Sequence, residues 1–175
     1  ISSVNYLWPS SDDSIFENTY KVPPSMYFKI DSNLKILKKK YWSIPKKEIK
    51  DSKKNIEIKL NSLIKKTIDK HLISDVKVSS FLSGGLDSSL ISVISRKELK
   101  SLSTFTIATN NKDSEVEKMP QDQKYARKVA DLYDLNHKEV NADEKLLNHL
   151  EFIVESLDEP IGDPAAINTY LICKY

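Results

Sequence analysis

The feature that most constrains this chain is the stretch VKVSSFLSGGLDSSLISV (76–93), in which a β-like run passes through two adjacent glycines into a helix-like run. Only three glycines occur in 175 residues, so the pair Gly84 and Gly85 answers a specific backbone need. Glycine adopts positive φ angles without strain and lets a bound group approach the main chain closely. The stretch therefore predicts a tight corner between a strand and a helix.

Helix-like and strand-like segments alternate beyond this corner. In order, they predict a helix over 56–72, a strand over 76–82, a helix over 87–98, a strand over 103–109, a helix over 122–134, a strand over 137–140, a helix capped by Asp143 that runs to Leu157, and a helix from Pro164 to 175. Strands that alternate with such helices form right-handed crossover units. The predicted fold class is α/β, with a parallel sheet covered by helices on both faces.

The same periodicities predict which side chains face the core. On the helices these are Ile56, Leu60, Leu63, Ile64, Thr67 and Leu72, then Leu90, Ile91 and Ile94, then Tyr125, Val129, Ala130 and either Leu132 or Tyr133, and finally Leu146, Leu147, Leu150, Ile153, Val154 and Leu157. The strand over 76–82 is predicted to be largely buried. Cys173, the single cysteine, lies in the apolar stretch TYLICKY and is predicted to be a buried structural thiol.

The first 45 residues read as irregular or β. Alternation on both sides of Asp31-Ser32-Asn33 predicts a hairpin after the Pro23-Pro24 entry. The lysine-rich stretch SIPKKEIKDSKKN follows as a linker. We expect three parts, 1–45, a linker over 46–55 and a domain over 56–175. The chain starts with Ile1 and stops inside a helical pattern, so we expect a piece of a larger protein, truncated on its C-terminal side.

Composition bounds the class of protein. The hydrophobic content of 39% supports a real core. One cysteine rules out an intramolecular disulfide framework and a cysteine-rich zinc site. No stretch reaches the ~18 to 20 apolar residues of a membrane span, and no signal sequence opens the chain. We therefore expect a soluble cytoplasmic protein.

Charge is unevenly distributed. Residues 35–70 carry 13 lysines against four acidic residues, whereas 111–163 carry 14 acidic residues against seven basic ones. The basic stretch has the character of a nucleic-acid footprint. Its lysines are not interleaved with aromatic residues and partly decorate one helix, which favours a solvated face.

The glycine corner has a chemistry of its own. In an open parallel sheet, ligands bind outside the carboxyl ends of the strands, and this corner lies at such an end. Unpaired N–H groups at the helix start, together with the flexible glycines, form a cradle for an anion. Hydroxyl donors are added by Ser83, Ser88 and Ser89. The Asp87 carboxylate would repel a phosphate unless Mg²⁺ lay between them. The residues predict a Mg-nucleotide phosphate site, and the alternative is a plain strand–turn–helix corner.

No lysine follows the glycines, so the corner is not a P-loop of the G-x-x-x-x-G-K-[ST] type. Ser-Gly-Gly-x-Asp-Ser-Ser instead resembles the signature of the PP-loop ATP pyrophosphatases. The stretches FLSGGLDSSLISVI, TFTIA, DQKYARKVADLYDLNHKEV and LDEPIGDPAAINTYLICK resemble, in order and spacing, the synthetase domain of the glutamine-dependent asparagine synthetases. This likeness is strong over 76–174. It implies a fold of the adenine nucleotide alpha hydrolase kind, which is Rossmann-like.

The upstream stretch PPSMYFKIDSNLKILKKKYW is similar to the segment that closes the glutaminase domain of that family. Ser25 stands where a glycine is usual. This weaker resemblance covers about 6–42 and is absent from the linker. It implies that 1–45 is the tail of an N-terminal glutaminase-type domain with its connector, and that 56–175 is part of the ATP-binding synthetase domain.

The resemblance implies roles for particular residues. The pyrophosphate grip would be formed by Ser83, Gly84, Gly85, Asp87 and Ser88, with Ser89 beside them, and Asp87 would be the catalytic residue and the Mg²⁺ contact through phosphate. Backbone contacts to adenine would come from Phe81, Leu82 and Ile107. The DEPxxDP stretch places Asp158, Glu159, Asp163 and Pro164 near the acceptor side. For Asp163, capping of the last helix is the alternative.

This chain also departs from the family pattern. IGDPAA replaces the threonine pair and the arginine of the narrower asparagine synthetases, and TNNKDSEVEKMPQ is a longer and more acidic loop than that family leads us to expect. The downstream SGxGxDExxGGY-like motif and the amino-terminal cysteine nucleophile are not in the sequence. We therefore expect the chain alone to be catalytically incomplete.

For the parent protein, the resemblance implies a carbon–nitrogen ligase of asparagine biosynthesis that uses ATP and Mg²⁺. Aspartate would be adenylated with release of pyrophosphate, and ammonia from glutamine would displace AMP. No nucleic acid or membrane partner is expected, and a homodimeric parent stays open. The alternatives are another carboxylate acceptor, a PP-loop enzyme that modifies RNA, and a non-catalytic nucleotide-binding relative. The three histidines, His71, His137 and His149, have no Ser or Cys partner placed by a motif and are expected to be surface or packing residues.

Overall fold

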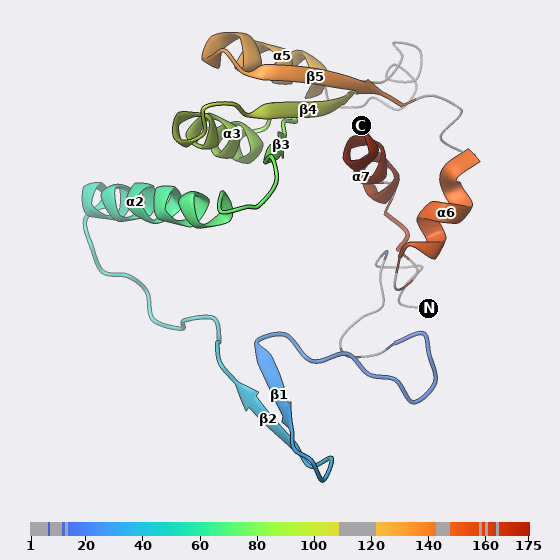
Figure 1. Ribbon diagram of the computed structural model, residues 1–175. Helices are drawn as coiled ribbons and strands as arrows, with labels where there is room; N and C mark the ends of the chain where they lie inside the picture. Colours follow the sequence, from blue (N-terminus) through green and yellow to red (C-terminus); the bar gives the residue numbers. More distant parts are fainter. Residues whose placement is uncertain are drawn as a thin grey trace. The chain divides into compact units, whose positions relative to one another are not determined.

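The computed structural model describes residues 7, 12, 14–108, 122–142, 148–157, 159, 161–163 and 165–175 (Figure 1). The chain divides into two compact units, the first Ile1–Lys50 with Glu151–Ala166 and the second Asp51–Leu150 with Ile167–Tyr175. The domain boundaries expected from the sequence stay predictions. In the described residues no helix is both long and apolar enough to cross a membrane.

The first unit contains the predicted hairpin. Strands β1 (Met26–Ile30) and β2 (Ile36–Lys40) are antiparallel. The turn between them is held by Asp31, whose Oδ1 accepts the N–H groups of Asn33 and Lys35, each at 2.9 Å. The short helix α6 (Leu150–Glu155) buries Ile153 and leaves Leu150 and Val154 exposed. Asp143, Leu146 and Leu147, predicted for this helix, lie outside the described residues.

The second unit contains a parallel sheet in the order β3–β4–β5, as the sequence predicts (Figure 1). Its strands are β3 (Ser79–Phe81), β4 (Ser103–Ala108) and β5 (Asn136–Asn141). Its helices are α2 (Lys53–His71), α3 (Leu86–Glu98), α5 (Asp122–Tyr133) and most of α7 (Ala165–Lys174). Ser52 is the N-cap of helix α2, and its Oγ accepts the Asn55 N–H at 3.2 Å. Because α2 starts at Lys53, the last three residues of the predicted linker are helical.

Helices contact both faces of this sheet. Ser80 of β3 shares a hydrogen bond of 2.8 Å with Ser92 of α3. Neighbouring strands continue the same face, where Glu139 of β5 binds Arg127 of α5. The opposite face carries Phe105 of β4, whose ring meets the ring of Tyr175, just after α7, at 5.8 Å. The predicted α/β class, with a parallel sheet covered on both faces, is confirmed.

The core lies between the end of β3 and α5. Leu82, Ala126, Ala130 and Leu135 form one buried cluster, with Val129 packed against it. Leu82 is completely buried, and its N–H donates to the Phe105 carbonyl at 2.8 Å, which extends the β3–β4 ladder by one residue. The segment that enters the glycine corner is therefore fixed by both packing and hydrogen bonding.

Several predicted core positions are wrong, for a common reason. Helix α3 turns its serines inward, so Ser92 and Ser95 are buried while Leu90 and Ile91 are exposed, and of the predicted three only Ile94 is buried. On helix α5 the predicted Ala130 is buried and Val129 packs against the core, whereas Tyr125, Leu132 and Tyr133 are exposed and the buried Ala126 was not predicted. Small side chains let both helices lie close to their neighbours. Apolar periodicity does not detect such faces.

Other segments expected to be buried are also exposed. Strand β3 is shorter than predicted and lies at an edge of the described sheet, so Phe81 and Val76 are exposed. Helix α2 buries only Ile68, and its predicted residues Ile56, Leu60 and Leu63 are exposed. Cys173 is exposed too, so its prediction as a buried thiol is wrong.

Candidate functional site

The glycine corner joins β3 to α3 at the carboxyl end of the sheet. Gly84 has φ +77°, the left-handed region that a residue with a Cβ rarely adopts. A Cβ at this position would lie 2.5 Å from the backbone nitrogen of Ala126 and equally close to Tyr125. The first turn of α5 therefore lies directly against the main chain of Gly84. Both reasons for a glycine apply at this one residue.

Gly85 is different. Its φ of −68° suits any residue, and it is the residue before the first turn of α3. A Cβ here would lie 3.3 Å from the Ser83 Oγ, the free end of a rotatable side chain. Gly85 is exposed, and only the hydroxyls of Ser83 and Ser88 lie within 4 Å of the place that a Cβ would take.

Helix α3 offers unpaired donors at this corner. Its first internal hydrogen bond runs from the Ser89 N–H to the Gly85 carbonyl at 3.0 Å. The N–H groups of Leu86, Asp87 and Ser88 precede that bond and have no partner within the helix. They point along the helix axis toward its positive end, which favours an anion.

The serine hydroxyls shape the corner. Ser83 Oγ and Ser88 Oγ lie 2.9 Å apart and share a hydrogen bond, and the Ser83 N–H also donates to Ser88 Oγ at 3.3 Å. The Ser88 hydroxyl donates to the Gly85 carbonyl at 3.3 Å, so the Ser83 hydroxyl is the donor to Ser88 and both hydroxyl hydrogens are engaged. Ser89 Oγ is buried and makes no hydrogen bond to any described residue.

Asp87 lies in the first turn of α3 and is exposed. Its carboxylate makes no hydrogen bond or ion pair with the part of the chain that the structure describes. No three His, Cys, Asp or Glu side chains among those residues gather as a metal cage. A single free carboxylate beside an anion cradle fits Mg²⁺ carried in by phosphates, because Mg²⁺ is commonly bound through one or two carboxylates plus phosphate oxygens.

The predicted adenine contacts also come together. Phe81 pairs with Phe105, and β4 continues to Ala108, so Ile107 lies beyond the ladder that β3 and β4 form. Polar backbone groups of β4 there have no partner in β3. Leu82 is completely buried and its N–H is bound to Phe105, so it offers no accessible backbone group here. Phe81 is exposed and Ile107 is half-buried, on neighbouring strands at the carboxyl end of the sheet.

The acceptor-side candidates belong to the first unit. Glu159 forms an ion pair with Lys21, at 2.7 Å from the Lys21 Nζ to each carboxylate oxygen. Asp163 accepts the Ala165 N–H at 2.8 Å, so it does hold the start of α7. Asp158 and Pro164 lie outside the described residues. Lys21 was not predicted, because its partner is 138 positions away and no local pattern indicates the pair.

Two titratable side chains of strand β5, Glu139 and His137, have hydrogen-bonding partners within the second unit. Glu139 accepts hydrogen bonds from Arg127, which lowers the pKa of Glu139. The Thr104 Oγ1 lies 3.0 Å from the Nδ1 of His137, and burial lowers the pKa of this histidine. The Nε2 of His137 is buried without a partner among the described residues. These residues stabilise the sheet and its α5 face, consistent with the expected packing role of His137.

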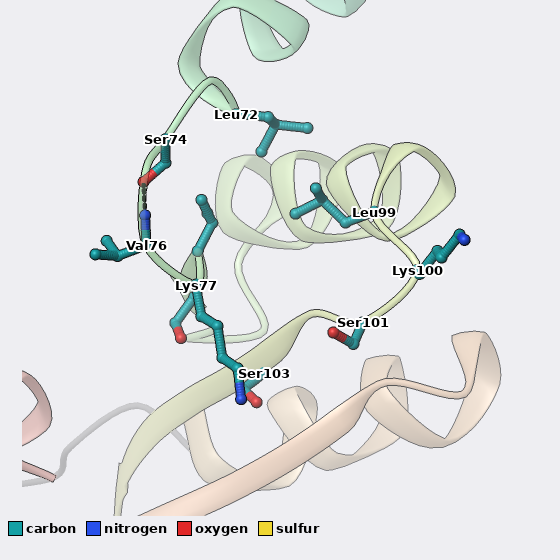
Figure 2. A pocket seen from close by; sticks show the side chains of 10 residues that line it. Leu72, Ser74, Val76, Lys77, Leu99, Lys100, Ser101 and Ser103 are labelled. Carbon is teal, nitrogen blue, oxygen red and sulfur yellow. Dashed lines mark hydrogen bonds between the residues drawn. The ribbon is translucent and has the colours of Figure 1, made fainter.

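A cavity of about 290 Å³ lies at the opposite end of the sheet (Figure 2). It is lined by Leu72, Ser74, Val76, Lys77, Val78, Ser79, Leu99, Lys100, Ser101 and Ser103. Ser79 and Ser103 are the first residues of their strands. The ends of α2 and α3 also meet here, and the carboxyl ends of helices disfavour anions. The cavity is therefore not the phosphate site.

The fold and the corner define a class first: an α/β domain with a parallel sheet and a glycine corner at the carboxyl end of that sheet. The family model for asparagine synthase matches residues 59–175. The chain belongs to this family.

The chain is similar to curated asparagine synthetases. It is 32% identical over 156 residues to "Asparagine synthetase [glutamine-hydrolyzing] 1" of Bacillus subtilis, covering 88% of this chain and 24% of that protein. It is 34% identical over 171 residues to a putative asparagine synthetase of Methanocaldococcus jannaschii, covering 92% of this chain and 31% of that protein. The chain thus spans less than a third of the length of these relatives. Among solved structures, NMN synthetase from Francisella tularensis is similar with a TM-score of 0.43 and 17% identity, over 71% of this chain and 50% of that chain.

Proposed function

We propose that the protein to which this chain belongs is an ATP-dependent amidating synthetase that forms asparagine, and that residues 83–88 bind the pyrophosphate part of ATP. The observation that carries the proposal is the glycine corner. Gly84 is fixed against α5, and Gly85 is exposed beside the unpaired N–H groups of α3. Family membership and the names of the curated relatives support the choice of reaction.

The reaction needs two displacements. In the first, an oxygen of the aspartate side-chain carboxylate attacks the α-phosphorus of ATP, and the bond to the bridging oxygen breaks so that pyrophosphate leaves with the electron pair. In the second, ammonia attacks the acyl carbon of the adenylate, and AMP leaves with the electrons of the broken carbon–oxygen bond. The amide nitrogen releases its extra proton to solvent. The ammonia would come from glutamine.

The residues of the corner suit the first displacement. Negative charge builds up on the departing pyrophosphate, and preorganised N–H donors at the start of α3 stabilise such charge without any proton transfer. Gly85 leaves the backbone accessible to phosphate oxygens. The Ser83 and Ser88 hydroxyls lie at the same place, and either could turn from its present acceptor to a phosphate oxygen when ATP binds. Asp87 would hold Mg²⁺ through the phosphates, and the ion, when bound, would neutralise charge on them.

The adenine would lie along the edge of β4 beyond Phe105, with backbone groups of Phe81 and Ile107 as contacts. Asp158, Glu159 and Asp163 stay candidates for the acceptor side. We expect the 175 residues alone to form no asparagine, because the family resemblance assigns further site residues and the glutaminase nucleophile to segments that this sequence does not contain. A different carboxylate acceptor is the alternative reading of IGDPAA.

The test uses the complete gene product with Mg-ATP, ammonia and aspartate, and scores AMP and amide by mass spectrometry. AMP together with asparagine is the expected result. Asp87→Asn should abolish pyrophosphate release with the fold unchanged, whereas Asp69→Asn, an exposed acid on α2, should have no effect. Undiminished release in the Asp87 variant would contradict the proposed metal contact.

If ATP binds but neither product appears, the proposal of asparagine formation is wrong. A panel of other carboxylates then separates a relative with a different acceptor from a nucleotide-binding protein without turnover.

A further inference from the structure

Residues ahead of the hairpin contact the acidic loop 159–163 at two points. Lys21 Nζ lies 2.7 Å from both carboxylate oxygens of Glu159. The Gly162 N–H donates to the Leu7 carbonyl at 2.7 Å. All four residues belong to the first unit. A loop far along the sequence is therefore held by the segment that enters β1.

The ion pair between Lys21 and Glu159 is shielded enough from solvent to stabilise the position of this loop. The side chains of Lys21 and Glu159 are only 32% and 28% exposed, so solvent screens them less than it screens an ordinary surface pair. Lys21 is itself anchored, because its N–H donates to the Asp12 carbonyl at 2.8 Å. Removing one partner would leave a partly buried charge unpaired, which costs more than the pair contributes.

The second contact is a close approach of two backbones. A Cβ at Gly162 would lie 3.2 Å from the Leu7 side chain and 3.4 Å from its Cα. Glycine at 162 thus lets the loop lie against Leu7, and one residue later Asp163 holds the first N–H of α7. The position of Asp163 follows from the position of this loop.

We infer that Lys21 is a positioning residue: its bond to Glu159 holds in place the loop that carries Asp163, the candidate acid for the carboxylate acceptor. Glu159 then serves the loop, because the Lys21 ammonium already engages both of its carboxylate oxygens, and Asp163 is left as the acid that this bond places. The statement that this loop serves the carboxylate acceptor rests on the proposed function. The contact between Lys21 and Glu159, and its effect on the loop, do not.

The first experiment needs no substrate. Hydrogen exchange of the Gly162 and Ala165 amides is compared in this chain for the natural sequence, Lys21→Met, Lys21→Arg and Lys46→Met. Lys46 is an exposed lysine of the same unit and serves as the matched control. Exchange at Gly162 should accelerate by about tenfold in Lys21→Met, the order expected when a partly shielded charge pair is lost. Lys21→Arg, which keeps the pair, and Lys46→Met should match the natural chain. Unchanged exchange in Lys21→Met would show that Lys21 does not hold the loop in place.

The second experiment uses the complete gene product and the carboxylate that it amidates. Lys21→Met should raise the KM for that carboxylate by about tenfold and leave the KM for ATP unchanged, since a misplaced loop weakens only the substrate that it contacts. The charge swap Lys21→Glu with Glu159→Lys should recover much of the loss. Equal effects on both KM values, or none, would overturn the positioning role. A failure of aspartate as substrate refutes only the proposed function, because the exchange result stands without it.

Discussion

Gly84→Ala is expected to destabilise the second unit severely, and the size of the effect follows from two terms. A left-handed backbone costs a residue with a Cβ about 1–2 kcal/mol. The new methyl group would also lie 2.5 Å from the Ala126 nitrogen and from the Tyr125 carbonyl carbon, so the first turn of α5 has to move. Overpacking of this kind costs about 1–3 kcal/mol. The expected loss is therefore about 2–5 kcal/mol.

A loss of this size is a large part of the total free energy of unfolding. Domains of this size are stable by about 5–15 kcal/mol. Any displacement of α5 also opens the cluster of Leu82, Ala126, Ala130 and Leu135, which is the core of this unit. The substitution thus acts on the fold through the backbone of the candidate site.

The assay is urea unfolding followed by far-ultraviolet circular dichroism. Helices α2, α3 and α5 all belong to the second unit and supply much of its signal. Tryptophan fluorescence would report on the wrong unit, because Trp8 and Trp42 both lie in 1–50. With a urea dependence of about 2 kcal/mol per molar, the midpoint should fall by about 1–2.5 M.

Gly85→Ala is the matched control. Its φ of −68° already suits alanine, and the nearest atom, Ser83 Oγ at 3.3 Å, belongs to a side chain that can rotate. Its midpoint should stay within about 0.5 M of the natural chain, because alanine before a helix costs about 1 kcal/mol at most relative to glycine. Equal midpoints for the two variants would refute the close approach of Gly84 to α5.

Three further predictions concern the same unit. Asp87→Asn in this chain should weaken binding of Mg-ATP at least about tenfold but leave binding of metal-free ATP unchanged or tighter, because the carboxylate repels phosphate when no Mg²⁺ lies between them; titration calorimetry measures both, and an equal loss in both would place Asp87 against the nucleotide rather than the metal. Burial lowers the pKa of His137, so the unfolded chain binds the proton more tightly and the free energy of unfolding should fall as pH drops below the usual histidine value of about 6.5. Urea midpoints between about pH 5 and 8 should show this slope in the natural chain and lose it in His137→Gln; a slope that persists would assign it to another group. Ser92→Ala should cost about 1 kcal/mol by removing the partner of Ser80, whereas Ser92→Leu should cost about 1–3 kcal/mol or more by pushing α3 off the sheet, and similar urea midpoints would contradict the tight packing.

Much of the fold was predictable because its signals are local. Strand and helix periods alternate clearly, and a parallel sheet follows from that order whatever the details of packing. The hairpin was predictable from one turn, since Asp31 makes its own hydrogen bonds to Asn33 and Lys35. Each of these elements depends on residues that are close in sequence.

The helix faces could not be predicted from apolar residues alone. In α3 the inward face carries the unpredicted Ser92 and Ser95, and in α5 it carries the unpredicted Ala126 beside Ala130, which the periodicity did predict. A close-packed interior selects for volume as well as for polarity, and a helix that lies near a sheet needs small residues there. A serine can be buried at no great cost when it has a partner, as Ser92 has in Ser80. Hydrophobic periodicity indicates which side chains gain free energy by leaving water. It contains no information on how closely a helix packs against the sheet.

The two adjacent glycines show how far sequence reasoning extends into the site. As a sequence feature they form one signal, a corner flexible enough for a bound anion. In the structure they do different work: Gly84 provides the positive φ and the contact with α5, and Gly85 provides the exposed backbone before α3. A rigid half and an accessible half suit a site that must hold a leaving group without rearranging, because donors that are already in place cost no reorganisation when charge develops. Under the proposed function, Gly85 can receive an anion because Gly84 fixes the corner against α5, and the pair of alanine variants measures how much of the stability of this unit depends on that fixed contact.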